Sequence, residues 1–416
     1  MIRARPLRAD RPSDFTPAFS RMGLPTPARE YLLEKVPVFQ VLLTGLPREA
    51  VHFLRSRFEA STAPGREDFP GWVAGDGRNR PGTGLLSGRK EQFERLIASA
   101  RTDPALAELA GALTRALESS SPPSPLVLGG RTFDFGSRTY LMGVVNVTPD
   151  SFSDGGRFLD AEAAIAHGLQ LAKAGADILD VGGESTRPGS PPVSTEEELA
   201  RILPVLQGLK ARTDVPLSVD TTKAAVAREA LRAGAVLVND ISGFHFDPDL
   251  PRVTAEAGAA CCLMHIRGTP ETMQQAPQYE DVVDEVLAFL EEGVARAVAA
   301  GVPRERVLVD PGIGFGKTLG HNLFLLRRLG ELRVLGLPVL VGTSRKSFLG
   351  RLTGDKPVGE RLAATLGSVV TVAAAGDADF VRVHDVAEAR DALTIAEAVR
   401  QALDGGALYA SGKVRG

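Results

Sequence analysis

Acidic and amide side chains come directly after several short apolar runs, where they could bind a ligand with many hydrogen-bond donors. Asp220, Asn239 and Asp310 occupy such positions, and Asp240 follows Asn239. A buried carboxylate is unfavourable without a cation or several donors beside it, so each one alone could equally be a helix cap or the partner of a lysine. Together they favour one pocket for a flat ligand with a guanidine-like edge, which pairs with a carboxylate through two parallel hydrogen bonds.

Basic side chains end two further apolar runs and indicate an anion site. Arg345 and Lys346 lie in the segment GTSRKS, and Arg382 lies two residues before His384 in RVHDV. A helix that begins at Ser347 would add free N–H groups and the positive end of its dipole. The alternative for each pair is a solvated surface position. His384 alone would more often be structural, but its place near Arg382 favours phosphate binding.

Two other polar segments allow more than one interpretation. VDPGIGFGK looks like a phosphate loop, but Pro311 stands where the Walker pattern requires glycine, and Lys317 stands where the dinucleotide fingerprint requires its third glycine. Its glycines more simply let the backbone approach a flat ligand beside Asp310. Asn146 ends another apolar run, and its amide oxygen suits Mg²⁺, although a turn-forming hydrogen bond to the backbone is the alternative.

These residues require a framework that brings the ends of eight apolar runs to one face. The runs are β-branched and continuous, which is typical of parallel strands covered on both sides, and amphipathic segments separate them. Eight strand–helix units match a (β/α)8 TIM barrel, an α/β fold whose active site lies at the carboxyl ends of the strands. An open doubly wound sheet is the alternative, but it rarely has polar ends on all its strands. The predicted strands are 140–145, 177–181, 216–219, 236–238, 259–264, 307–309, 338–341 and 380–383.

A Ser- and Pro-rich segment, ESSSPPSP, is typical of a linker and divides the chain. Before it, residues 28–59 have helical apolar spacing, residues 61–88 are rich in Gly and Pro and predict a long loop, and residues 89–117 are helical with a break at Pro104. We therefore predict a small, mostly helical N-terminal extension of unknown role. The predicted boundaries are 1–117 for the extension, 118–137 for the linker and lead-in, 138–404 for the barrel and 405–416 for a C-terminal tail.

The composition argues against several classes of protein. The 416 residues carry a net charge of −3 and are 44% hydrophobic, which gives no reason to expect nucleic acid or a membrane as a partner. No run approaches the ~18–20 apolar residues of a membrane span, and no apolar signal segment follows the basic N-terminus. Cys261 and Cys262 are neighbours in a predicted strand and point to opposite faces. Buried free thiols in a cytoplasmic protein are therefore expected, rather than a disulfide or a zinc site.

Taken in order, the signatures of the eight units resemble those of the dihydropteroate synthases, pterin-binding enzymes of folate biosynthesis. The resemblance covers about residues 138–404, essentially the whole predicted barrel, and leaves out residues 1–125. It implies a transferase that joins 4-aminobenzoate to 6-hydroxymethyl-7,8-dihydropterin diphosphate, giving 7,8-dihydropteroate and pyrophosphate. The signatures are NVTPDSFSDGG (146–156), GGESTRPGS (182–190), SVDTTK (218–223), VNDISG (238–243), LMHIRGTPETMQ (263–274), VDPGIGFGK (309–317), GTSRKS (342–347) and RVHDV (382–386).

The resemblance also implies a role for each motif residue. Asp310 would hold the amino-pyrimidinone edge of the pterin through two hydrogen bonds, and the other residues around the ring would be Asp220, Asn239, Met264, Phe315 and Lys346. The residues implied for the diphosphate are Asn146, Arg382 and His384, with Asn146 also on Mg²⁺. Those implied for 4-aminobenzoate are Phe152, Thr186, Arg187 and Pro188, from two loops expected to order on binding, and Ser347. The implied catalytic residues are Lys346, Arg382, His384 and Asp154, the last stabilising positive charge on the pterin methylene.

The residue types agree with the implied chemistry. An arylamine is a neutral nucleophile at pH 7 and needs no strong base before attack, and the sequence shows no convincing Ser-His-Asp or Cys-His nucleophile. The difficult step is cleavage of the carbon–oxygen bond, where Mg²⁺, Arg382 and His384 would stabilise the leaving diphosphate. We therefore expect a largely dissociative displacement with Mg²⁺ as cofactor. The family resemblance also implies a homodimer.

Two other functions share parts of this pattern. A methyltransferase that binds methyltetrahydrofolate has a similar acid-lined pocket, but it needs neither a diphosphate site nor aminobenzoate loops. The segments NVTPDSF, STRPG and SRKS argue against it. A non-catalytic ligand-binding relative is disfavoured because the motif residues are intact, namely Asn146, Thr186, Asp310, Lys346, Arg382 and His384.

Overall fold

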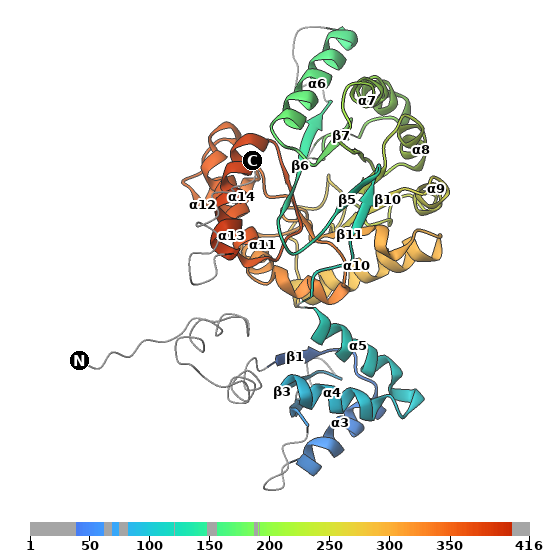
Figure 1. Cartoon of the computed structure of the whole chain (residues 1–416), viewed down its shortest axis with the longest axis vertical. Helices are drawn as coiled ribbons and strands as arrows, with labels where there is room; N and C mark the ends of the chain where they lie inside the picture. Colours follow the sequence, from blue (N-terminus) through green and yellow to red (C-terminus); the bar gives the residue numbers. More distant parts are fainter. Residues whose placement is uncertain are drawn as a thin grey trace, which may run out of the picture. The chain divides into compact units, whose positions relative to one another are not determined.

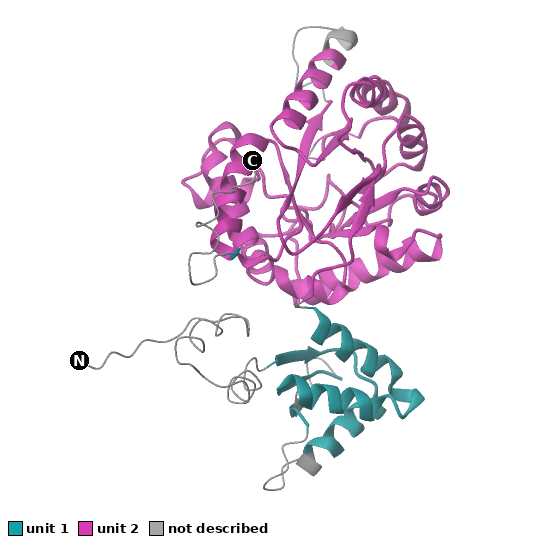
Figure 2. Cartoon of the chain, viewed as in Figure 1, with its two compact units in different colours: residues 1–120, 401–416 teal, residues 121–400 magenta. Residues whose placement is uncertain are grey.

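The chain forms two compact units, one from residues 1–120 with 401–416 and the other from residues 121–400 (Figure 2). Among the residues that the structure describes, no helix is both long and apolar enough to cross a membrane. The computed structural model describes residues 39–61, 69–74, 82–119, 121–147, 156–186, 190 and 192–401 (Figure 1).

The larger unit is built on eight parallel strands. They pair in the order β11-β10-β9-β8-β7-β6-β13-β12, and Val309 of β11 bridges to Val339 beside β12, which joins the two ends of the sheet. Each of the eight predicted strands overlaps an observed one, so the predicted (β/α)8 barrel is confirmed. The strands are β6 (Tyr140–Asn146), β7 (Ile178–Gly182), β8 (Leu217–Asp220), β9 (Leu237–Asp240), β10 (Ala260–Met264), β11 (Val307–Asp310), β12 (Leu340–Val341) and β13 (Phe380–Val383).

Helices cover the outside of the barrel, as Figure 1 shows for α7 to α10. Polar caps set where two of them begin: Ser194 Oγ accepts from the backbone N–H of Glu197 at α7, and the Asp281 carboxylate accepts from two N–H groups at α10. The helices are α6 (Gly156–Lys173), α7 (Thr195–Lys210), α8 (Ala224–Arg232), α9 (Leu250–Glu256), α10 (Val282–Ala299), α11 (Leu319–Arg327), α12 (Ser347–Leu352), α13 (Leu362–Ala375) and α14 (Val386–Gln401), with 3-10 segments at Arg304–Arg306, Leu329–Leu335 and Val358–Glu360.

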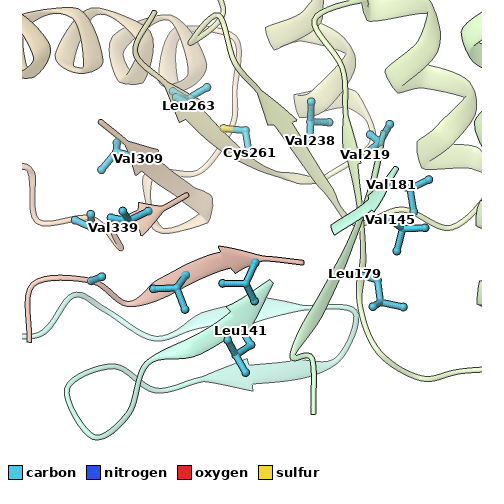
Figure 3. Packing of buried hydrophobic residues seen from close by; sticks show 14 of the residues in the cluster. Leu141, Val145, Leu179, Val181, Val219, Val238, Cys261, Leu263, Val309 and Val339 are labelled. Carbon is cyan, nitrogen blue, oxygen red and sulfur yellow. The ribbon is translucent and has the colours of Figure 1, made fainter. Parts of the chain in front are cut away.

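Side chains along each barrel strand point alternately outward and inward, and this separates two apolar layers. One set of strand residues packs outward against the helices, including Leu141, Val181 and Cys261 (Figure 3). Residues one position away along the strands, such as Met142 and Cys262, face the barrel interior and form a separate buried cluster. The two cysteines are thus buried and free in different clusters, as the alternation predicts. This alternation also decides which residues at the carboxyl ends of the strands face the interior.

A short hairpin forms the floor of the barrel. Its strands, β4 (Leu126–Leu128) and β5 (Arg131–Phe133), pair antiparallel, and their apolar side chains are buried against the amino-terminal ends of the barrel strands. The ring centroid of Phe133 lies 4.9 Å from that of Tyr140. The sequence predicts a linker and lead-in at residues 118–137, whereas residues from 121 onward cluster with the barrel. The proline and serine residues of ESSSPPSP are typical of a linker, and nothing in them indicates that the buried hairpin begins at the next residue, Leu126.

The smaller unit combines helices with a three-stranded antiparallel sheet. Its hydrophobic core includes Leu54, Trp72, Leu86 and Phe93. The strands are β1 (Phe39–Leu43), β2 (Gly71–Ala74) and β3 (Gly84–Gly88) in the order β1-β3-β2, and the helices are α3 (Arg48–Ser61), α4 (Lys90–Ala100) and α5 (Ala107–Glu118), with a 3-10 turn at Pro104–Leu106.

Two sequence predictions for the smaller unit were wrong, and one was confirmed. The run at residues 39–43, which the sequence places in a helical pattern, is a strand, because four apolar residues in a five-residue run fit either period. The predicted loop 61–88 contains β2 and β3. Gly84 is required there because a Cβ would lie 1.9 Å from the Trp72 ring, so that glycine marks close packing rather than a loop. The predicted break at Pro104 is confirmed by its 3-10 turn.

Removal of residues 1–125 should leave a folded, active barrel, because the hairpin floor and all eight barrel strands remain. Extending the deletion to residue 137 should destabilise it, since burial of the hairpin side chains is lost. In the full chain, Phe133→Ala should lower the free energy of unfolding by about 3–5 kcal/mol. Circular dichroism with denaturant unfolding measures all three effects. Equal stability of the two truncated proteins would show that the hairpin is not part of the barrel core.

Candidate active site

Four strands bring charged and amide side chains together at the carboxyl end of the barrel. Arg382 on β13 donates from Nε to Asp180 Oδ2 at 2.7 Å and from Nη2 to Asp220 Oδ2 at 2.7 Å. Asn239 on β9 donates from Nδ2 to the same Asp180 oxygen at 2.9 Å. The predicted acid, amide and base therefore share one mouth.

Burial controls the protonation of this cluster. It raises the pKa of the Asp220 carboxyl to about 7, with Arg382 opposing the rise and Asp180 adding to it. Burial by itself lowers the pKa of Arg382, but the two carboxylates more than offset this, so the pKa of Arg382 is raised and it stays charged. The protonation of Asp220 therefore changes near neutral pH.

Asp310 and Lys346 lie at the same mouth. Asp310, 4% exposed at the end of β11, accepts from the backbone N–H of Gly312 at 2.7 Å. Lys346 Nζ donates to the Ile313 carbonyl and lies 4.8 Å from the centroid of the Phe315 ring. Burial raises the pKa of Asp310, with Lys346 opposing it. Burial likewise lowers the pKa of Lys346 to about 8, with Asp310 opposing it.

The glycine-rich loop after β11 is shaped by close backbone approach and by a buried lysine. A Cβ at Gly312, whose φ is +66°, would lie 1.9 Å from the His265 carbonyl oxygen. Lys317 Nζ contacts His265 Nδ1 at 2.8 Å and donates to the carbonyls of Gly312 at 2.9 Å and Phe315 at 3.0 Å. Lys317 therefore fixes the loop from within, and the loop in turn presents Phe315 beside Lys346.

The loops after β12 and β13 position the other basic residues. His384 Nδ1 and Ser344 Oγ are 3.0 Å apart, which orients the half-buried imidazole. Arg345 forms an ion pair with Asp385, with Nε 3.1 Å from Oδ2, so its role is structural. Ser347 is exposed and is the first residue of α12.

Three more of the predicted site residues lie at or just after strand ends. Asn146 ends β6, half-buried, and Met264 ends β10 in register with Asp310. Thr186 is half-buried in the loop after β7. Four predicted residues lie outside the described residues, namely Phe152, Asp154, Arg187 and Pro188. Within the described ranges, no group of three His, Cys, Asp or Glu side chains could hold a metal ion.

The sequence did not identify Asp180 as a residue of the mouth, and it wrongly grouped Asp240 with the residues that are. Asp180 is fully buried and binds both Arg382 and Asn239. Its signal was a carboxylate inside the apolar run ILDVG, which a buried strand tolerates only with a cation beside it. Asp240 faces the other side of its strand and accepts from the backbone N–H groups of Ser242 at 2.8 Å and Phe244 at 2.6 Å. Asp240 therefore orders a turn and is not part of the mouth.

Comparison with known proteins places this barrel in one family. The family model of pterin binding enzymes matches residues 142–384. A dihydropteroate synthase of Synechocystis sp. is 48% identical over 277 residues, which are 67% of this chain and 96% of that protein.

Two solved structures agree with this match. Xanthomonas albilineans dihydropteroate synthase with 4-aminobenzoic acid is 46% identical and superposes with a TM-score of 0.63, covering 68% of this chain and 100% of that one. The same enzyme in complex with 7,8-dihydropteroate gives 44% identity, a TM-score of 0.61, and coverage of 67% and 100%. This chain therefore belongs to the dihydropteroate synthase family of pterin-binding enzymes.

Proposed function

We propose that this transferase condenses 6-hydroxymethyl-7,8-dihydropterin diphosphate with 4-aminobenzoate, giving 7,8-dihydropteroate and pyrophosphate. The observation that carries the proposal is the single mouth in which Asp220 and Asp310 lie with Arg382 and Lys346. The solved relatives bound to 4-aminobenzoic acid and to 7,8-dihydropteroate support it.

The pterin ring is assigned to the acid-lined side of the mouth. Asp310 holds the amino-pyrimidinone edge, because one buried carboxylate can accept two parallel N–H groups. Asp220 accepts hydrogen bonds from the edge of the pterin, and Asn239 can both accept and donate them. Lys346, which lies beside the Phe315 ring, donates a hydrogen bond to the pterin. Met264 is buried at the same level as Asp310 and supplies apolar contact.

The diphosphate is assigned to Arg382, His384 and Asn146. Arg382 has five N–H donors, and its bonds to Asp180 and Asp220 fix the guanidinium plane. The donor set also suits Mg²⁺, because that ion commonly takes one or two protein oxygens and completes its shell with substrate phosphate and water. Asn146 would hold Mg²⁺, which when bound supplies positive charge beside the leaving diphosphate.

The 4-aminobenzoate is assigned to the side of the mouth bounded by the loops after β6 and β7. Thr186 contacts its ring and Ser347 binds its carboxylate, and the family resemblance assigns to the same substrate three residues outside the described ones, Phe152, Arg187 and Pro188. Family resemblance supports this assignment and two broader ones: the protein works as a homodimer, and it works in the cytoplasm.

The reaction is largely dissociative. The methylene carbon–oxygen bond breaks with its electron pair going to the diphosphate, whose charge Arg382 and His384 stabilise. The electron-rich pterin spreads the positive charge left on the methylene, and Asp154 stabilises that charge. The amine nitrogen then forms the new carbon–nitrogen bond and loses its proton afterwards, so no base must act before attack.

A coupled pyrophosphate assay tests the function. Release should require the pterin diphosphate, 4-aminobenzoate and Mg²⁺ together, and chelation of the ion should abolish it. A rate of pyrophosphate release that is the same with and without aminobenzoate, or transfer of a methyl group instead, would contradict the proposal.

A variant of the ring-binding acid tests the assignment of the pterin ring. Asp310→Asn should weaken binding of the 6-hydroxymethyl pterin alcohol about tenfold to a hundredfold, because a charged acceptor is lost. Asp391→Asn, on the exposed surface of α14, is the matched control and should bind normally. Calorimetry gives both affinities.

Binding of the pterin alcohol should be tightest between about pH 7 and pH 8. Below about pH 7 Asp220, whose pKa is raised to about 7, takes up a proton and loses acceptor capacity. Above about pH 8 Lys346, whose pKa is lowered to about 8, loses its charge. The alcohol carries no diphosphate, so the titration reports the protein groups. Asp220→Asn should remove the acid limb, and an unchanged acid limb in that variant would assign it to another group.

The dissociative character can be measured with substrate deuterated at the methylene. A normal, sizeable secondary kinetic isotope effect is expected, because that carbon approaches trigonal geometry as the bond to oxygen breaks. The effect should be measured with Arg382→Lys as well, where slower cleavage makes the chemical step more fully rate-limiting. A value near unity in both proteins would indicate a direct displacement by the amine.

A further inference from the structure

A buried ion-pair cluster lies beside the mouth, and we call it the loop clip. It consists of Lys223, Glu184 and Glu198. Lys223 Nζ lies 2.7 Å from Glu184 Oε2 and 2.6 Å from Glu198 Oε2. Glu198, in the first turn of α7, is fully buried, and the other two side chains are about a quarter exposed or less.

The loop clip joins the two ends of one loop, residues 183–194, whose described part includes Thr186. The third N–H of the Lys223 ammonium donates to the Val193 carbonyl at 2.8 Å. Glu184 Oε1 accepts from the backbone N–H of Val193 at 3.0 Å, and Arg201 Nη1 donates to the Gly183 carbonyl at 2.7 Å. All three donors of the ammonium are thus used, and they hold both arms of the loop to α7 and to the turn after β8.

Electrostatics make the lysine indispensable to this arrangement. Burial raises the pKa of Glu198, and Lys223 opposes the rise. Burial lowers the pKa of Lys223, but Glu184 and Glu198 more than offset this, so the ammonium stays charged. Without Lys223, two carboxylates would face one another across a poorly solvated gap, and their repulsion would separate the loop from α7.

We propose that Lys223 is a positioning residue for 4-aminobenzoate, because it holds the loop that carries Thr186 against the barrel. This inference rests on the proposed function. Lys223 lies three residues after Asp220, so the turn that presents an acid to the pterin also anchors the wall of the neighbouring subsite. The pterin contacts come from strand ends, whereas the aminobenzoate contacts depend on the loop. Loss of the loop clip should therefore affect the two substrates unequally.

Steady-state kinetics with Lys223→Met tests the inference. The KM for 4-aminobenzoate should rise by about tenfold or more, since a small displacement of a binding wall weakens positioning strongly. The KM for the pterin diphosphate and the Kd of the pterin alcohol should change less than about twofold. Lys223→Arg should retain most of the affinity, and Lys210→Met, exposed at the end of α7, should match the wild type.

A second substitution separates positioning from a general loss of stability. Glu184→Gln combined with Lys223→Met removes one of the two facing carboxylates and should recover part of the aminobenzoate affinity. Equal rises in both KM values, or a lower Tm with both KM values unchanged, would overturn the inference. If Lys223→Met fails to fold, the double variant and Lys223→Arg still decide the outcome.

Hydrogen exchange keeps the inference distinct from the proposed function. Amides of residues 183–186 should exchange faster in Lys223→Met than in wild type, while those of β8 stay unchanged. If wild-type protein releases no pyrophosphate in the presence of both substrates, the proposed function fails. Unchanged exchange in residues 183–186 would overturn the loop clip whatever the activity.

Discussion

The buried guanidinium of Arg382 is the interaction on which the mouth of the barrel depends. It is held by Asp180 and Asp220, and Asp180 in turn holds Asn239, so four strands are linked through one cation. Breaking such a pair on one side leaves an unpaired buried charge, which costs about 3–5 kcal/mol. The cluster therefore fixes the strand ends relative to one another. Each ligand contact that we propose relies on that fixed geometry.

The apolar floor beneath this cluster determines its protonation. Leu308 and Cys262 belong to the apolar cluster inside the barrel, which also contains the buried side chains of the β4–β5 hairpin. Water is thereby kept from the underside of the charges, and burial is the largest influence on the pKa of Asp220 and of Lys346. The hairpin thus contributes to the chemistry of a site that it does not touch, because it makes the interior poorly polarisable.

The sequence predicted most of the barrel because polar residues interrupt apolar runs at one regular place. Asp220, Asn239 and Asp310 were identified in this way, and all three face the mouth. Asp180 was missed because it lies inside its run, where only the partner on β13, distant in sequence, explains it. Asp240 shows the opposite error, since an end-of-strand position does not reveal which face a side chain takes. In the smaller unit, strands β1 to β3 were not predicted, because each contains too few apolar residues to establish a strand period.

The charges of the mouth also bear on how it could accept a diphosphate. In the described part of the mouth, Arg382 forms ion pairs with both Asp180 and Asp220, and Lys346 acts on Asp310. Arg382 already balances two carboxylates, so it can direct hydrogen bonds to an anion but has little net positive charge to offer. A diphosphate would therefore be bound weakly by these residues alone. A cation that arrives with the substrate at Asn146 would remove this deficit, which is the electrostatic reason for the Mg²⁺ that we propose. Arg382 and His384 would then stabilise the leaving group chiefly through directed hydrogen bonds.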